Sequence, residues 1–180
     1  KETTVPLPHD WESVLLNEGG HGFYRVRYGQ DLMDRLLKSG LDRLAVTERF
    51  NLINDAWATT IAGLMPLTGY LDLTARFTTE EDKNVWAVIL DSFSFLNRIV
   101  TVEDRPMLEA FVRSRLSPAV TSLGWAPRSG ESEGTKQLRG ELIGAQGRLG
   151  NDPVTQERAA ELYGAYRLNA TAVDPNVVPS

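Results

Sequence analysis

Histidine and cysteine, the side chains that most often hold a catalytic metal, are scarce in this chain. The sequence contains His9 and His21 and no cysteine. The helical zinc motif H-E-x-x-H needs two histidines one turn apart with a glutamate beside them. These two lie twelve residues apart, one in a proline-flanked loop and one in a glycine-rich turn. We therefore expect solvated turn histidines, with no metal ligands, thiol nucleophile or zinc ribbon.

Patterns that bind phosphate or activate a serine are also missing. The glycines of GGHG (19–22) and GELIGAQG (140–147) match neither the Walker spacing nor the strand-to-helix turn of dinucleotide-binding folds. Serine is plentiful, but the G-x-S-x-G motif does not occur. Acidic clusters at 80–82 and 131–133 lie at expected helix starts, where negative charge complements the helix dipole. No catalytic residue is assigned from these patterns.

Asp55 and Asp91 are different, because each lies inside an apolar helical pattern. A buried carboxylate needs a partner, and Arg49 or Arg98 could supply one. A structural ion pair is favoured over a ligand role for both aspartates.

Composition excludes several classes of function. The chain has 180 residues, 42% of them hydrophobic, and a net charge of -5 with acidic and basic residues well mixed. The absence of a basic stripe argues against nucleic acid as a partner. No apolar run approaches the ~20 residues of a membrane helix, and KETTVPLPHDWES (1–13) lacks the apolar region of a signal peptide. The cytoplasm is therefore the expected location, although the lack of cysteine leaves the compartment undecided.

Residues 12–28 predict a β-hairpin. Glu12 to Asn17 forms one strand, the glycine-rich residues 19–22 form the turn, and Phe23 to Tyr28 alternates with the period of a second strand. An isolated two-stranded hairpin is marginal in water, and this one carries much aromatic surface. We expect it to be more mobile than the helices, or to be sequestered by a neighbouring copy through its unpaired edge.

Only helical signals follow residue 30. Apolar positions recur at helical spacing, Pro118 predicts a kink or a helix end, and Asp152-Pro153 is a helix start that recurs at Asp174-Pro175. The stripe of Trp57, Trp86, Phe93 and Phe111 is interpreted as core. The expected helices are 31–38, 47–63, 67–77, one from a capping box at 78–81 to Val100, 101–123, 132–149 and 153–168.

These lengths and short turns predict a mainly α fold. We expect a helical repeat stack, an α-α superhelix of the HEAT or armadillo kind, preceded by the short hairpin. No strict sequence period is visible, so helix lengths and loops alone support the repeats. The start signal at Asp174 has barely one turn after it, which suggests that the helical region continues beyond Ser180.

The junction between hairpin and helices is the most specific pattern in the chain. Residues 22–28 read GFYRVRY, and residues 47–77 read TERFNLINDAWATTIAGLMPLTGYLDLTARF. Together they resemble the zinc aminopeptidases of the aminopeptidase N type, a group that includes the puromycin-sensitive and endoplasmic-reticulum aminopeptidases. The usual pattern there is G-[FY]-Y-R-V-N-Y-D and then D-R-x-x-L-I-[ND]-D-A-F-x-L-x-x-x-G. This chain departs from it at Arg27, Gly29, Glu48 and Trp57.

The resemblance continues through VWAVILDSFSFLNRIV (85–100) and GWAPRSGESEGTKQLRGELI (124–143), and spans residues 12–168. It implies that residues 1–29 are the terminal strands of a small β-sandwich domain. It also implies that residues 30–180 are the first half of a C-terminal α-helical domain. The family's zinc ligands, catalytic glutamate and amine-binding motif belong to an upstream catalytic domain. No residue here matches them, so the resemblance assigns no catalytic residue, no metal ligand and no cofactor to this fragment.

In relatives the helical domain covers the catalytic chamber and shapes access of peptides whose N-terminal residue is removed. The implied partners are therefore the upstream catalytic and β-sandwich domains, and peptide substrates. By position, Arg98 is the candidate for a contact with the far end of a peptide, against the simpler reading of a surface arginine or a partner of Asp91. The competing hypothesis is a free-standing helical-repeat interaction module. An upstream H-E-x-x-H in the same reading frame would separate the two.

Overall fold

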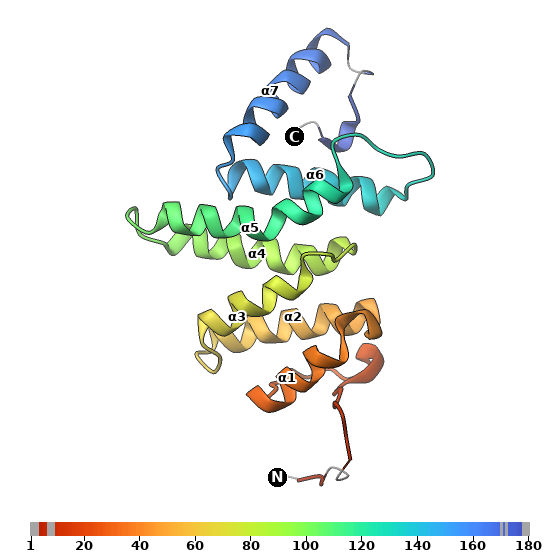
Figure 1. Cartoon of the computed structure of the whole chain (residues 1–180), viewed down its shortest axis with the longest axis vertical. Helices are drawn as coiled ribbons and strands as arrows, with labels where there is room; N and C mark the ends of the chain where they lie inside the picture. Colours follow the sequence, from red (N-terminus) through yellow and green to blue (C-terminus); the bar gives the residue numbers. More distant parts are fainter. Residues whose placement is uncertain (1–3, 7–9, 170, 172, 178–180) are drawn as a thin grey trace. The chain divides into compact units, whose positions relative to one another are not determined.

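The computed structural model describes residues 4–6, 10–169, 171 and 173–177. The chain divides into two compact units, residues 1–67 and 68–180. Helices make up both units, and the described residues contain no strand. The prediction of a mainly α fold is therefore confirmed (Figure 1).

The first unit is built on two helices, α1 and α2. Because apolar residues recur on one face of each, Met33 and Leu36 of α1 and Leu52 and Ile53 of α2 become buried. Gly40 ends α1 with a φ of 99°, a conformation that glycine adopts without strain. The elements are η1 (Glu18–Gly20), α1 (Gln30–Ser39), η2 (Leu41–Arg43) and α2 (Val46–Ile61).

The structure does not confirm the predicted hairpin. Residues 10–29 contain the short 3₁₀ turn η1 and otherwise irregular backbone. The two expected strands still approach each other, since the Leu16 amide donates to the Tyr28 hydroxyl at 2.9 Å. A two-stranded ladder alone is marginal, and the described part of the chain offers no sheet to extend it. Side-chain contacts hold this segment instead.

The described residues of the second unit form five α-helices. α4 and α5 run alongside each other, α6 contacts both, and α7 leaves the end of α6 at a steep angle (Figure 1). The helices are α3 (Leu67–Thr74), α4 (Lys83–Ile99), α5 (Arg105–Leu123), α6 (Glu133–Arg148) and α7 (Pro153–Leu168), with 3₁₀ turns η3 (Ala75–Phe77) and η5 (Pro175–Val177).

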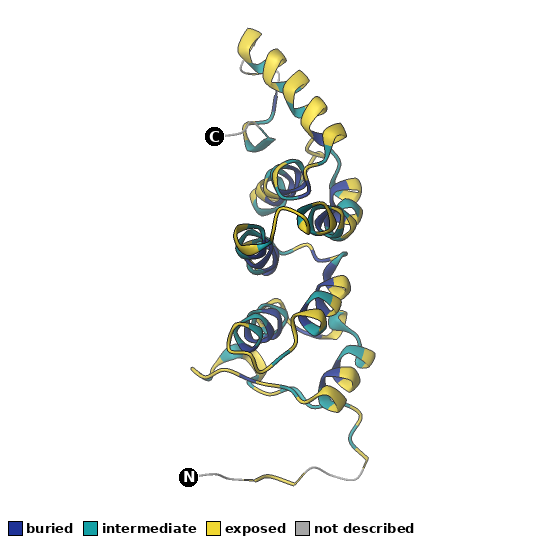
Figure 2. Ribbon diagram, turned by 90° about the vertical axis from the view of Figure 1, so that its left-hand side faces the viewer, coloured by how far each residue is buried: buried dark blue, intermediate teal, exposed yellow. Residues whose placement is uncertain are grey.

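The core of the second unit lies between α3, α4, α5 and α6. Trp86 is fully buried and its indole N–H donates to the Glu80 carbonyl oxygen at 2.9 Å, as a buried tryptophan requires. Phe93 and Phe111 meet edge to face with centroids 5.7 Å apart. Unlike the core helices, α7 is exposed along most of its length and buries only Thr155 (Figure 2).

Helix starts follow the capping rules, with one correction. The predicted capping box at 78–81 does not start α4. The N-cap is Asp82, whose carboxylate accepts from the amides of Asn84 and Val85, while Glu80 accepts from the amides of Glu81 and Asp82. Asp152 caps α7 as predicted, by accepting from the Thr155 amide at 3.1 Å.

Pro118 does not end α5. The helix continues through it to Leu123, and Figure 1 shows α5 bent along its length. A proline ring excludes the hydrogen bond to the carbonyl four residues earlier, here that of Ser114. The bend fits that loss.

Candidate functional site

Arg98 lies at the C-terminal end of α4 with its side chain exposed. Its guanidinium is 5.7 Å from the centre of the Phe95 ring, and no ion pair or hydrogen bond engages it among the described residues. Asp91, the partner that the sequence suggested, is itself exposed and is not paired with Arg98 in the part of the chain that the structure describes. Arg98 is therefore a solvated cation that can attract an anionic group.

Exposed apolar side chains follow Arg98 in the sequence, at the end of α4 and the start of α5. Ile99, Val102 and Met107 are all exposed. Met107 is 69% exposed, although its apolar side chain lies on α5. It lies in the first turn of α5, beyond the reach of the core. A cation beside apolar side chains can bind a carboxylate and an adjacent apolar group, but it provides no group for bond cleavage.

Asp55 forms a second polar site, in the first unit. It is 6% exposed, and its Oδ1 accepts from Nη1 of Arg25 at 2.8 Å. Its Oδ2 accepts from the Val26 amide at 3.0 Å. The predicted structural ion pair is confirmed for Asp55, with Arg25 as a partner that sequence reasoning did not propose. No local pattern indicated this pair, because Arg25 lies 30 residues before Asp55 in a segment predicted to be a strand.

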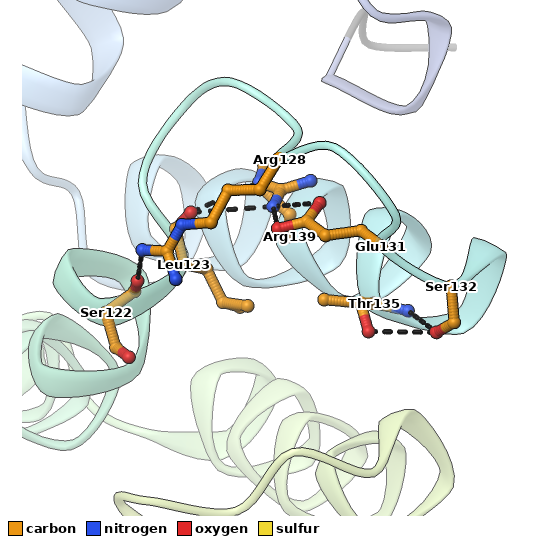
Figure 3. A network of polar contacts seen from close by, with 7 residues as sticks. All are labelled: Ser122, Leu123, Arg128, Glu131, Ser132, Thr135 and Arg139. Carbon is orange, nitrogen blue, oxygen red and sulfur yellow. Dashed lines mark hydrogen bonds and ion pairs between the residues drawn. The ribbon is translucent and has the colours of Figure 1, made fainter.

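Arg139 forms the third polar site, in the second unit (Figure 3). It is 1% exposed and its Nη2 contacts both carboxylate oxygens of Glu131 at 2.6 Å. That contact holds the pKa of the Glu131 carboxyl below its ordinary value. Nη1 of Arg139 is buried and has no hydrogen-bond partner among the described residues. A nearly buried cation of this kind depends on its one carboxylate.

The loop between α5 and α6 is closed around that pair. Arg128 donates to the Ser122 carbonyl oxygen at 2.6 Å, and Ser132 caps α6 by accepting from the Thr135 amide at 3.1 Å (Figure 3). Sequence reasoning did not single out Arg139. The available signal was its position in LRGELI, between leucines that are buried on α6.

Within the described ranges, no group of three or more histidine, aspartate or glutamate side chains is arranged so that it could hold a metal ion. His21 is exposed in the turn after η1, and His9 lies outside the described residues. None of their helices combines the length and apolar character needed to cross a membrane.

The sequence model of the ERAP1-like C-terminal domain matches residues 13–180. Aminopeptidase M1-A of Oryza sativa subsp. japonica is 30% identical over 148 residues, which are 80% of this chain and 17% of that protein. The puromycin-sensitive aminopeptidase of Caenorhabditis elegans is 26% identical over 174 residues, which are 94% of this chain and 18% of that protein.

The glutamyl aminopeptidase of Mus musculus is 28% identical over 170 residues, covering 91% of this chain and 18% of that protein. The chain therefore spans less than a fifth of the length of these relatives. The resemblance to aminopeptidases seen at the hairpin–helix junction is confirmed over most of the chain. We conclude that this chain belongs to the ERAP1-like C-terminal domain family of helical aminopeptidase domains.

Proposed function

We propose that this chain is the non-catalytic helical region of a zinc-dependent aminopeptidase, a hydrolase that removes the N-terminal residue of peptides. In the whole protein it covers the catalytic chamber and shapes access of peptides to it. The observation that carries this proposal is the family match over residues 13–180, together with relatives that are named aminopeptidases and are more than five times longer than their matched parts.

Its partners in this proposal are an upstream catalytic domain, which supplies zinc and all catalytic residues, and a small β-sandwich domain. Residues 1–29 would be the terminal strands of that sandwich, and residues 30–180 the first half of the helical domain. Irregular backbone in residues 10–29 is compatible with strands that need a neighbouring sheet. The antiparallel helices of the second unit would belong to a longer α-α superhelix of repeats.

The reading frame upstream of residue 1 provides the direct test. We expect an H-E-x-x-H motif followed about 18 residues later by a glutamate, the ligand set of a zinc peptidase. An upstream frame without that motif would favour a free-standing helical-repeat interaction module. We propose the cytoplasm as the location, and cell fractionation of the full-length protein would test it.

Within this proposal, Arg98 binds the C-terminal carboxylate of a peptide. The cation is exposed and unpaired among the described residues, and Ile99 and Val102 beside it offer apolar contacts for the last side chain. A charge-assisted bond between guanidinium and carboxylate is stronger than a neutral one. In a chamber from which water is partly excluded, this attraction increases further.

Peptide titration of the chain, followed by NMR, tests the role of Arg98. A peptide with a free C-terminus should bind about tenfold more tightly than its C-terminal amide. Arg98→Ala should abolish that difference. Arg158→Ala, which removes an exposed arginine from α7, should preserve it. Equal binding of both peptides to the unmodified chain, or an unchanged difference in Arg98→Ala, would contradict the assignment.

A further inference from the structure

Residues 17–22 form a closed loop that rests on the start of α2. Asn17 closes it, because its side-chain oxygen accepts from the Gly22 amide at 2.6 Å and its side-chain nitrogen donates to the Gly22 carbonyl oxygen at 3.0 Å. Gly20 has a φ of 72°, and a Cβ there would lie 2.7 Å from Thr47 and 2.9 Å from Asn51. The loop therefore fits closely against α2 only because residue 20 is glycine.

Two carboxylates of α2 hold this loop and the residues that follow it. Glu48 and Asp55 are seven residues apart, so they lie two turns apart on one face of the helix. Glu48 Oε1 accepts from the Gly19 amide at 3.0 Å, and its Oε2 accepts from the Ala45 amide at 2.8 Å. Asp55 accepts from the Val26 amide and from Arg25, as described above.

The contacts are mutually dependent. Val26 is buried, and its amide would be left without an acceptor if Asp55 were removed. Asp55 is also buried, and it would lose both hydrogen-bonded partners if the segment left α2. Leaving either group unpaired in the interior is costly. Because the Gly19 and Val26 donors are backbone amides, the two carboxylates fix the backbone of this segment and not only its side chains.

We propose that Glu48 and Asp55 form a rigid joint that fixes residues 17–28 to α2. On the sequence alone this segment was expected to be mobile or sequestered by another copy. The joint instead makes the segment and α2 a single body, so that any domain attached before residue 17 is held in a defined orientation to α2. Glu48 and Asp55 are thus positioning residues. What they position, a β-sandwich and a catalytic domain, rests on the proposed function.

Amide hydrogen exchange measured residue by residue by NMR on the 180-residue chain tests the joint. In the unmodified chain, the Gly19 and Val26 amides should be protected at least tenfold over an unstructured chain. Asp55→Ala should lower protection of Val26 tenfold or more and leave the amides of residues 50–61 unchanged. Asp55→Asn keeps one oxygen acceptor and should retain more of that protection. Glu48→Ala should lower the protection of the Gly19 amide tenfold or more.

Asp31→Asn is the matched control, since it weakens an exposed ion pair with Arg35 on α1 and contacts nothing in the loop. This variant should leave the exchange protection of the Gly19 and Val26 amides unchanged. If Asp55→Ala also lowers protection of residues 50–61, Glu48→Ala decides the outcome. Unprotected Gly19 and Val26 amides in the unmodified chain, or protection unaffected by either variant, would overturn the joint. The measurement uses neither peptide nor catalysis, so its result is separate from that for the proposed enzyme.

Discussion

At the scale of single residues, buried polar groups impose the strongest requirements in this chain. Arg139 is the clearest case, because a cation at 1% exposure has Glu131 as its carboxylate partner. Replacing both residues of such a pair by well-packed apolar residues need not lower the stability of the fold. Removing only one partner is destabilising, because the other charge is then buried without compensation. Glu131 therefore makes the stability of the second unit depend on pH.

We predict that stability decreases in acid through Glu131. Arg139 lowers the pKa of this carboxyl in the folded state from the ordinary value of 4.5. The folded state then binds fewer protons than the unfolded state, so its contribution is complete above pH 4.5 and is lost as the pH falls through the lowered value. Urea unfolding from pH 7 to pH 2.5 should show a shallower acid decline in Glu131→Gln.

Glu161→Gln serves as the control for that titration, because Glu161 pairs with Arg158 on the exposed face of α7. Exposed ion pairs contribute little, so this variant should follow the unmodified chain. An identical acid decline in Glu131→Gln and the unmodified chain would show that the pair does not couple stability to pH.

Trp86 carries a second prediction at this scale. Its side chain is fully buried and its N–H is paired with Glu80. Trp86→Ala should cost about 3–5 kcal/mol of unfolding free energy, through lost burial and the cavity left behind. Trp57 is only half-buried, so Trp57→Ala should cost less. Urea midpoints of both variants measure the difference, and a loss below about 1 kcal/mol for Trp86→Ala would contradict its place in the core.

At the scale of elements, the glycines of α6 determine what can pack on that helix. Glycine in a helix allows close packing but lowers the stability of that helix. The structure separates the roles of the glycines in α6. A Cβ at Gly140 would lie 1.8 Å from the backbone oxygen of Asn176 in η5, whereas a Cβ at Gly144 would meet only the end of Arg148 at 3.5 Å. Only the first position requires glycine.

We predict opposite effects for the two matched substitutions. Gly144→Ala should stabilise the chain by about 0.5–1 kcal/mol, since alanine favours the helix more than glycine does. Gly140→Ala carries the same helical gain but should displace η5, so residues 173–177 should lose protection from hydrogen exchange. Thermal unfolding and exchange of both variants are the measurements. Undiminished protection in Gly140→Ala would mean that η5 does not pack on α6 as the structure has it.

At the scale of the whole molecule, the described residues form a helical fold with three polar sites. The polar sites are a solvated cation, a carboxylate joint and a buried ion pair, and none of them joins a nucleophile to a base. The family match assigns this chain to a helical aminopeptidase domain, and the covering role is our proposal for the whole protein.

The chain by itself should therefore neither bind zinc stoichiometrically nor hydrolyse aminoacyl substrates. Elemental analysis after dialysis should find zinc well below one atom per chain, and alanyl and leucyl reporter amides should remain uncleaved. A zinc-loaded aminopeptidase of the same family is the positive control. Stoichiometric zinc, or activity that persists after repurification, would contradict the proposed division between this region and a catalytic domain.

The sequence by itself determined the helices and the family. Apolar positions at helical spacing and the N-cap at Asp152 act over a few residues, so they can be recognised without knowing the neighbours. The helix bounds accordingly differ by a few residues from those expected, mainly at the start of α4, where Thr78, Asp82 and Glu80 all offered capping oxygens. The two junction motifs were specific enough to indicate aminopeptidases.

Tertiary structure alone decided which polar groups meet. Arg25 and Asp55 are 30 residues apart, and no local pattern selects Arg25 over other cations for that carboxylate. The burial of Arg139 and the exposure of Met107 likewise depend on which helix covers each position. Residues 12–28 show the same limit, because their alternation suits a strand only beside a sheet. Strand pairing requires hydrogen bonds to another segment, whereas a helix satisfies its backbone within itself, so the helices were predictable and the hairpin was not.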